Sequence, residues 1–129
     1  MGLAERKAIQ AAKDTDYKAF ETKVQSITGA TIKLDFDWSA VENHKECMWI
    51  MDNKKYNSYM LDRVIEMLTK VCSDDMGKSA VKESLKEIKM IPSAGDVEFA
   101  GGVLTIRNDL TGNGAYDADS IRKTLEKGL

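Results

Sequence analysis

Two carboxylates near residue 36 are spaced for joint chemistry. Asp35 and Asp37 alternate with apolar residues, so in an extended strand their side chains share one face, roughly 7 Å apart. Such a pair could act as general acid and base or hold a hard cation. Alternation also puts polar residues on the solvent face of any half-buried strand, and an aspartate after a strand often caps a helix. The pattern is compatible with both interpretations.

The single histidine, His44, stands close to Cys47 in the sequence. Together with Asp35 and Asp37, it could form a small hydrolase-like or metal-assisted site in which the imidazole transfers protons. A nucleophilic Cys47 would need His44 as its base and a third group to orient the ring. The chain has no G-x-S-x-G elbow, phosphate-binding loop or dinucleotide fingerprint. An enzyme is therefore the alternative hypothesis, and no cofactor is predicted.

A polar segment near the C-terminus partly resembles the calcium loop of EF-hands and dockerins. Ser120 holds the closing position, where a bidentate acid is usual, and a predicted strand precedes the loop instead of a helix. The resemblance implies a calcium-stabilised domain with a degenerate loop at 109–117. The simpler interpretation is a glycine and asparagine turn before a helix cap, so we expect calcium to bind weakly or not at all. The residues that match the loop's first, third, fifth, sixth and ninth positions are Asp109, Thr111, Asn113, Gly114 and Asp117.

Aromatic residues and methionines concentrate in residues 38–60, which we call the aromatic/Met segment. Such side chains suit adaptable binding surfaces, although they also fill irregular gaps in a core. We therefore favour a non-enzymatic module that binds a protein or a small ligand through this segment. The candidate contact residues are Trp38, His44, Trp49, Tyr56 and Tyr59.

A row of lysines follows helical spacing in the second half of the chain. On one continuous helix these side chains would share a side, where they could meet phosphate or an acidic partner. Glutamates border the row, so an exposed solvated face is the favoured interpretation. The row consists of Lys78, Lys82, Lys86 and Lys89.

The N-terminal third predicts two helices and a strand. Residues 3–13 are good helix formers, residues 14–16 supply turn and cap chemistry, and residues 17–27 repeat apolar side chains at helical spacing. These helices are expected to form a hairpin. Residues 31–37 alternate as a half-buried strand, and a short helix is expected over residues 38–44.

The strongest helical pattern covers residues 56–72. Its apolar stripe is wide enough to pack against a sheet, and acidic caps at residues 73–75 indicate that another helix follows. The predicted core positions of the stripe are Leu61, Val64, Ile65 and Leu68.

The rest of the chain predicts three short strands and a helix. The strands are expected at residues 88–91, 97–100 and 103–107, and Gly101-Gly102 is a two-residue hairpin turn. A final helix begins near Asp117. The element order is ααβααβββα, and consecutive strands favour hairpins. The sequence thus predicts an α+β domain with a small antiparallel sheet of about four strands and helices packed mainly on one face.

Length and composition fit a single domain over residues 1–129. The chain has a mass of 14.4 kDa, a net charge of -2 and a pI near 5.5, which argues against nucleic acid as a partner. No apolar run approaches a membrane span, and the N-terminus lacks the apolar core of a signal peptide. We therefore expect a soluble, cytoplasmic protein with reduced cysteines whose partner is a protein or a small molecule.

Overall fold

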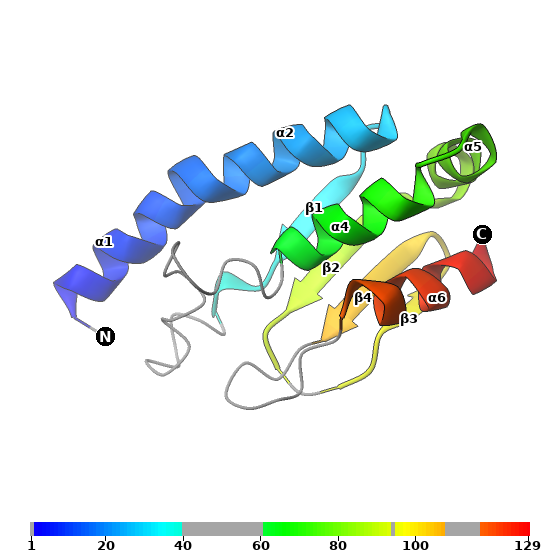
Figure 1. The fold of residues 1–129 in the computed structure, drawn as a ribbon. Coiled ribbons are helices and arrows are strands. Elements are labelled where there is room, and N and C mark those ends of the chain that lie inside the picture. The colour runs from blue at the N-terminus through cyan, green and yellow to red at the C-terminus, as the bar shows by residue number, and fades with distance from the viewer. Residues whose placement is uncertain (1, 40–60, 94, 108–116) are drawn as a thin grey trace.

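The computed structural model describes residues 2–39, 61–93, 95–107 and 117–129, and it combines helices with a four-stranded sheet (Figure 1). The α+β class is confirmed. Helices α2, α4 and α6 lie together over one face of the sheet, as expected (Figure 1). The described elements are α1 (Leu3–Ala11), η1 (Ala12–Asp16), α2 (Tyr17–Thr28), β1 (Lys33–Phe36), α4 (Leu61–Val71), α5 (Asp75–Ser84), β2 (Glu87–Ile91), β3 (Glu98–Ala100), β4 (Val103–Arg107) and α6 (Ala118–Gly128).

The strand pairing differs from the predicted antiparallel sheet. The order is β1-β2-β4-β3, in which β1, β2 and β4 are parallel and only β3 is antiparallel to its neighbour. Antiparallel strands need a short turn, whereas parallel strands need a long crossover. The chain between β1 and β2 includes α4 and α5 and provides such a crossover, while β4 inserts between β2 and the edge strand β3. The sheet is therefore mixed.

The predicted hairpin between β3 and β4 is confirmed. Gly101 and Gly102 have φ angles of 60° and 81°. A residue with a Cβ atom adopts such positive φ angles only at a cost in conformational energy. Ala100 pairs with Val103 on either side of the turn. Two consecutive positive φ angles are what a two-residue turn between twisted strands requires.

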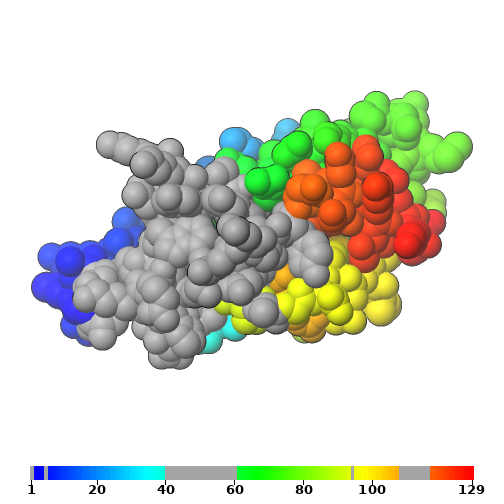
Figure 2. Space-filling model, turned by 60° about the horizontal axis from the view of Figure 1, so that its bottom comes forward, coloured from blue at the N-terminus to red at the C-terminus, as the bar shows by residue number. Residues whose placement is uncertain are grey.

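The expected N-terminal helical hairpin is wrong, because the chain continues as one helical rod. The segment η1 is π-helical and joins α1 directly to α2 (Figure 1). The polar residues that were predicted to form a turn make hydrogen bonds within the helical rod. The Gln10 amide donates to the Asp14 carboxylate at 3.0 Å, and the Thr15 hydroxyl donates to the Ala11 carbonyl at 2.6 Å. The rod carries α1 to the end of the molecule opposite α6 (Figure 2).

The core lies between the sheet and the helices. Leu34, Ile88 and Leu104 are register partners across three strands and face the helical layer. From α4, Leu61, Val64 and Leu68 are buried as predicted, and Ile65 is half-buried. The opposite face of the sheet carries charged side chains, and four of them are exposed: Lys33, Asp35, Lys89 and Glu98.

The predicted row of lysines is not one helical stripe. Helix α5 ends at Ser84, because Leu85 is extended with φ of -89° and ψ of 112°. The chain then forms strand β2, in which apolar residues alternate with polar ones and Ile88 and Met90 face the core. Lys78 and Lys82 therefore lie on α5, whereas Lys86 lies in the link that follows and Lys89 lies on β2.

Candidate functional site

A cavity of about 450 Å³ lies at the carboxyl ends of β1 and β2. We call it the β1–β2 cavity. Carboxyl ends of parallel strands are common ligand sites, because the chain leaves the sheet there and exposes side chains around a crevice. Its polar and apolar lining includes Asp35, Asp37 and Trp38 from β1 and the chain after it, and Lys89, Met90 and Ile91 from β2.

The cavity brings together the two aspartates singled out in the sequence. Asp35 lies on the solvent face of β1, where its register partner is Lys89. Asp37 follows the strand, and its backbone amide still donates to the Met90 carbonyl at 2.9 Å. The Ser39 hydroxyl donates to the Asp37 carboxylate at 2.5 Å. Asp35, Asp37 and Lys89 thus line the same space.

Trp38 is held by aromatic neighbours. Its ring centroid lies 4.6 Å from that of Phe36 and 5.5 Å from that of Tyr17, whose ring also packs on Phe20 at 5.8 Å. These contacts fix the half-buried indole, since tilted and edge-to-face aromatic pairs are favourable arrangements. Trp38 is the one predicted partner-contacting residue that lies within the described residues.

The π-helical segment brings two further side chains to this cluster. The Lys13 ammonium lies over the Trp38 ring, 5.3 Å from its centroid, which is cation–π geometry. The Tyr17 hydroxyl is buried beside the backbone of Phe36. Burial raises the pKa of the Tyr17 phenol, and the negative charges of Glu21 and Asp35 act in the same direction. The phenol is therefore neutral at physiological pH.

Sequence reasoning missed Lys13 and Tyr17 as neighbours of Trp38, and Lys89 as a neighbour of Asp35. The first two reach the indole only because the helix continues through η1, where a turn was expected. Alternation does place Lys89 on the polar face of its strand. Its position beside Asp35 depends on the parallel register of β1 and β2, which the predicted antiparallel sheet did not contain.

Most of the aromatic/Met segment and most of the calcium-like loop lie outside the described residues. These predictions concern His44, Trp49, Tyr56 and Tyr59 in the first segment and Asp109, Thr111 and Asn113 in the second, and they remain predictions. In the part of the chain that the structure describes, no group of three histidine, cysteine, aspartate or glutamate side chains could hold a metal ion.

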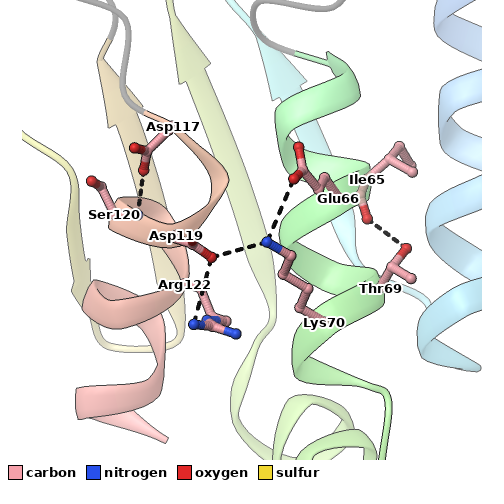
Figure 3. A network of polar contacts seen from close by, with 8 residues as sticks. All are labelled: Ile65, Glu66, Thr69, Lys70, Asp117, Asp119, Ser120 and Arg122. Carbon is pink, nitrogen blue, oxygen red and sulfur yellow. Dashed lines mark hydrogen bonds and ion pairs between the residues drawn. The ribbon is translucent and has the colours of Figure 1, made fainter.

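Asp117 caps helix α6. Its carboxylate accepts the Ser120 backbone amide at 2.7 Å (Figure 3), which is typical of an N-cap aspartate. This hydrogen bond lowers the pKa of Asp117 below its ordinary value. The carboxylate thus has a structural role whether or not the preceding loop binds calcium.

A polar network on the helical layer joins α6 to α4 (Figure 3). The Lys70 ammonium lies 3.0 Å from the Asp119 carboxylate and 3.5 Å from that of Glu66, and Arg122 approaches Asp119 at 3.5 Å. The hydrogen bond with Asp119 is the main reason that the pKa of Lys70 is raised. The opposite charges are matched within the network, so we assign it to helix packing and not to ligand binding.

Comparison of the chain with protein-family models, with curated proteins and with solved structures finds no match in any of the three. Among the described helices, none has the length and apolar character needed to cross a membrane.

Proposed function

We propose that the chain is a binding module whose ligand occupies the β1–β2 cavity and carries a cationic group on an apolar body. The observation that carries this proposal is that two aspartates and one lysine line a cavity together with a tryptophan held by aromatic neighbours. Asp35 has Lys89 as its neighbour in register. Among the residues that line the cavity, Asp37 therefore supplies the surplus negative charge, which favours an amine or guanidinium group. The Lys13 ammonium lies over the Trp38 ring and is not part of that lining.

The apolar part of the lining supports a ligand with a hydrocarbon or aromatic body. Trp38 and Ile91 are both half-buried, so each has surface that a ligand can cover. Tryptophan is enriched among the residues that dominate binding energy, and rigid neighbours reduce the entropy lost on binding. The contacts of Trp38 with Phe36 and Tyr17 provide this rigidity.

Titration with phenethylamine and with phenethyl alcohol tests the proposal. The two molecules share an aromatic body, but only the amine is a cation at pH 7. Backbone amide shifts of Asp37 and Trp38 in proton–nitrogen NMR spectra report occupancy of the cavity. We expect the amine to bind about tenfold more tightly, since a hydrogen bond to a charged group contributes about 1.5 kcal/mol or more.

The variant Asp37→Asn removes the negative charge of Asp37 while it keeps the size and shape of the side chain. The amide can still accept the Ser39 hydroxyl, so we expect the fold to persist, amine affinity to fall about tenfold and alcohol affinity to stay unchanged. Asp75→Asn is the matched control, because Asp75 is exposed in the first turn of α5 and does not line the cavity. Equal affinities for the two probes, or an Asp37→Asn variant that binds the amine normally, would refute the proposal.

A small hydrolase-like or metal-assisted enzyme using Asp35, Asp37 and His44 is the second candidate. It is favoured by the same cavity, because both carboxylates border it. Titration with Mn²⁺ tests the metal-assisted form through paramagnetic broadening of amide signals. Broadening centred on Asp35 and Asp37 would support a metal site, and broadening spread over other acidic surfaces would count against it.

A further inference from the structure

The outer edge of β1 carries main-chain groups that no described strand pairs with. Strand β1 is the first in the sheet order, so β2 is its only described neighbour. The Lys33 amide donates to the Lys86 carbonyl at 3.0 Å, and the Asp37 amide donates to the Met90 carbonyl at 2.9 Å. Main-chain groups alternate in direction along a strand. The N–H and C=O groups of Leu34 therefore point away from β2.

A cleft of about 450 Å³ lies along this edge, between α2 and β1. We call it the α2–β1 cleft. Helix α2 runs in the helical layer on the side of β1 away from β2, so it extends over the position that an added strand would occupy (Figure 1). The apolar lining of the cleft includes the buried Val24 and Ile32 and the half-buried Leu34. Exposed polar residues of α2, among them Glu21 and Gln25, form its rim.

Strand β1 carries an aromatic contact near its end and charges on its solvent face. Near the end of β1, the ring of Tyr17 packs against Phe36 with a centroid distance of 6.3 Å. On the solvent face of the same strand, Lys33 and Asp35 are exposed on either side of Leu34. Each already has a neighbour of opposite charge on β2, since the Lys33 ammonium lies 3.7 Å from the Glu87 carboxylate and Lys89 is the register partner of Asp35. An added strand would place its own outward side chains beside Lys33 and Asp35.

We propose that the α2–β1 cleft binds an extended peptide that pairs antiparallel with β1 and reads basic, apolar, acidic from N- to C-terminus. The apolar residue lies opposite Leu34 and points beneath α2. The basic residue lies opposite Asp35 and the acidic residue opposite Lys33, so each charge gains a second complement on the side away from β2. Main-chain bonds to Leu34 provide affinity, and the alternate side chains provide specificity.

A second copy of this chain fits the cleft less well than a peptide. The run Lys33-Leu34-Asp35 has the proposed charge order itself, so β1 of another copy would match it in charge. Antiparallel pairing about a two-fold axis would put both α2 helices on the same side of the joined sheet. Since α2 already extends over the added strand's position (Figure 1), two copies would bring their α2 helices into collision. An extended peptide is therefore the ligand that fits the cleft.

Two peptides of identical composition test the charge order. The first is acetyl-Ser-Lys-Val-Glu-Ile-Ser-amide, and the second exchanges its lysine and glutamate. Binding to the full chain is followed by the NMR amide shifts of Leu34 and of the cleft residues. We expect the first peptide to bind about tenfold more tightly, because both cross-strand charge pairs change from attractive to repulsive in the second.

N-methylation tests the main-chain bonding. In the proposed pairing the peptide's valine N–H donates to the Leu34 carbonyl, whereas the N–H of its lysine points away from β1. Methylation of the valine nitrogen should therefore reduce affinity about tenfold or more, and methylation of the lysine nitrogen should leave it within about twofold.

Variants of the protein locate the site. Gln25→Trp places a large side chain at the cleft, and we expect it to abolish peptide binding. Ser26→Trp is the matched control, because Ser26 is exposed on the same helix and does not line the cleft. The double variant Lys33→Asp with Asp35→Lys should reverse the preference between the two peptides. Thermal melts of each variant show whether the fold is retained.

The results that overturn the proposal are distinct. They are no binding of the first peptide at millimolar concentration, equal or tighter binding of the second, or binding that persists in Gln25→Trp. Dimerisation that is lost in Lys33→Asp would assign the edge to a second copy and also overturn it. The β1–β2 cavity is tested with other probes, so either proposal can fail alone.

Discussion

Leu68→Ala tests whether α4 contributes the central layer of the core. Leu68 is 0% exposed on the face of α4 that packs in the core cluster. The change removes three carbon atoms from water-free surroundings, which costs about 2.4 kcal/mol at about 0.8 kcal/mol for each buried methylene equivalent. The cavity left behind adds to this, so the expected loss is about 3 to 5 kcal/mol. That is a large part of the stability of a domain of this size.

Leu3→Ala provides a control with the same chemistry. Leu3 is 60% exposed in the first turn of α1, so its truncation should cost no more than about 0.5 kcal/mol. Urea titrations of both variants and the unmodified chain give the free energies of unfolding, and unchanged slopes confirm comparable denatured states. A Leu68→Ala loss within 1 kcal/mol of the Leu3→Ala loss would refute the burial of this face of α4.

Four other changes have defined outcomes. Replacing Gly101 and Gly102 together with valine should cost about 2 to 4 kcal/mol in thermal or urea unfolding, because both φ angles are positive; unchanged stability would contradict the hairpin. Burial raises the pKa of the Cys72 thiol, so with the other cysteine replaced by serine, iodoacetamide should modify it more slowly at pH 8 than a free cysteine; an equal rate would contradict this. Asp117→Ala should lower the melting temperature at pH 7. The folded-state pKa of Asp117 lies below its ordinary 3.8, so this difference should shrink as the pH falls from neutral through the lowered value, and a difference that does not shrink as the pH falls would contradict the charged cap. Millimolar calcium should leave the melting temperature unchanged, whereas a saturable rise that Asp109→Ala removes would assign a site to the loop.

Local periodicity predicted most elements of the fold. The apolar stripe of α4, the Asp117 cap and the Gly101-Gly102 turn each depend on residues close in sequence. Side-chain period and turn chemistry act over that range, so they are visible without tertiary structure. The α+β class followed from the order of these elements.

Strand order and the N-terminal rod could not be obtained in this way. Whether β2 pairs with β1 or with β3 depends on how α4 and α5 cross over the sheet, which no local signal records. In the rod, Asp14 and Thr15 can bond to a turn or to their own helix, since short polar side chains satisfy either conformation. Packing of Tyr17 against Phe36 and Trp38 supports the continuous helix.

The candidate site was accessible to sequence reasoning only in part. Asp35, Asp37 and Trp38 stand together in the chain, so their types and spacing drew notice, whereas Lys89 joins them only through a tertiary register. No pattern in the sequence indicated the α2–β1 cleft. An edge strand can be identified only when the order of the strands in the sheet is known. The sequence therefore indicated which residue types could form a site, but not how they are arranged in space.

Parallel pairing with β2 explains why one short strand supports two different proposals. In a parallel ladder, alternate residues of β1 direct their main-chain groups to β2, which leaves those of Leu34 for the outer edge. The same pairing aligns the carboxyl ends of β1 and β2, so Asp37 and Ile91 meet around one cavity. A strand between two neighbours would have no free edge, and an antiparallel neighbour would have placed its amino end beside Asp37. The α2–β1 cleft thus depends on β1 being an edge strand, and the β1–β2 cavity depends on its parallel pairing with β2.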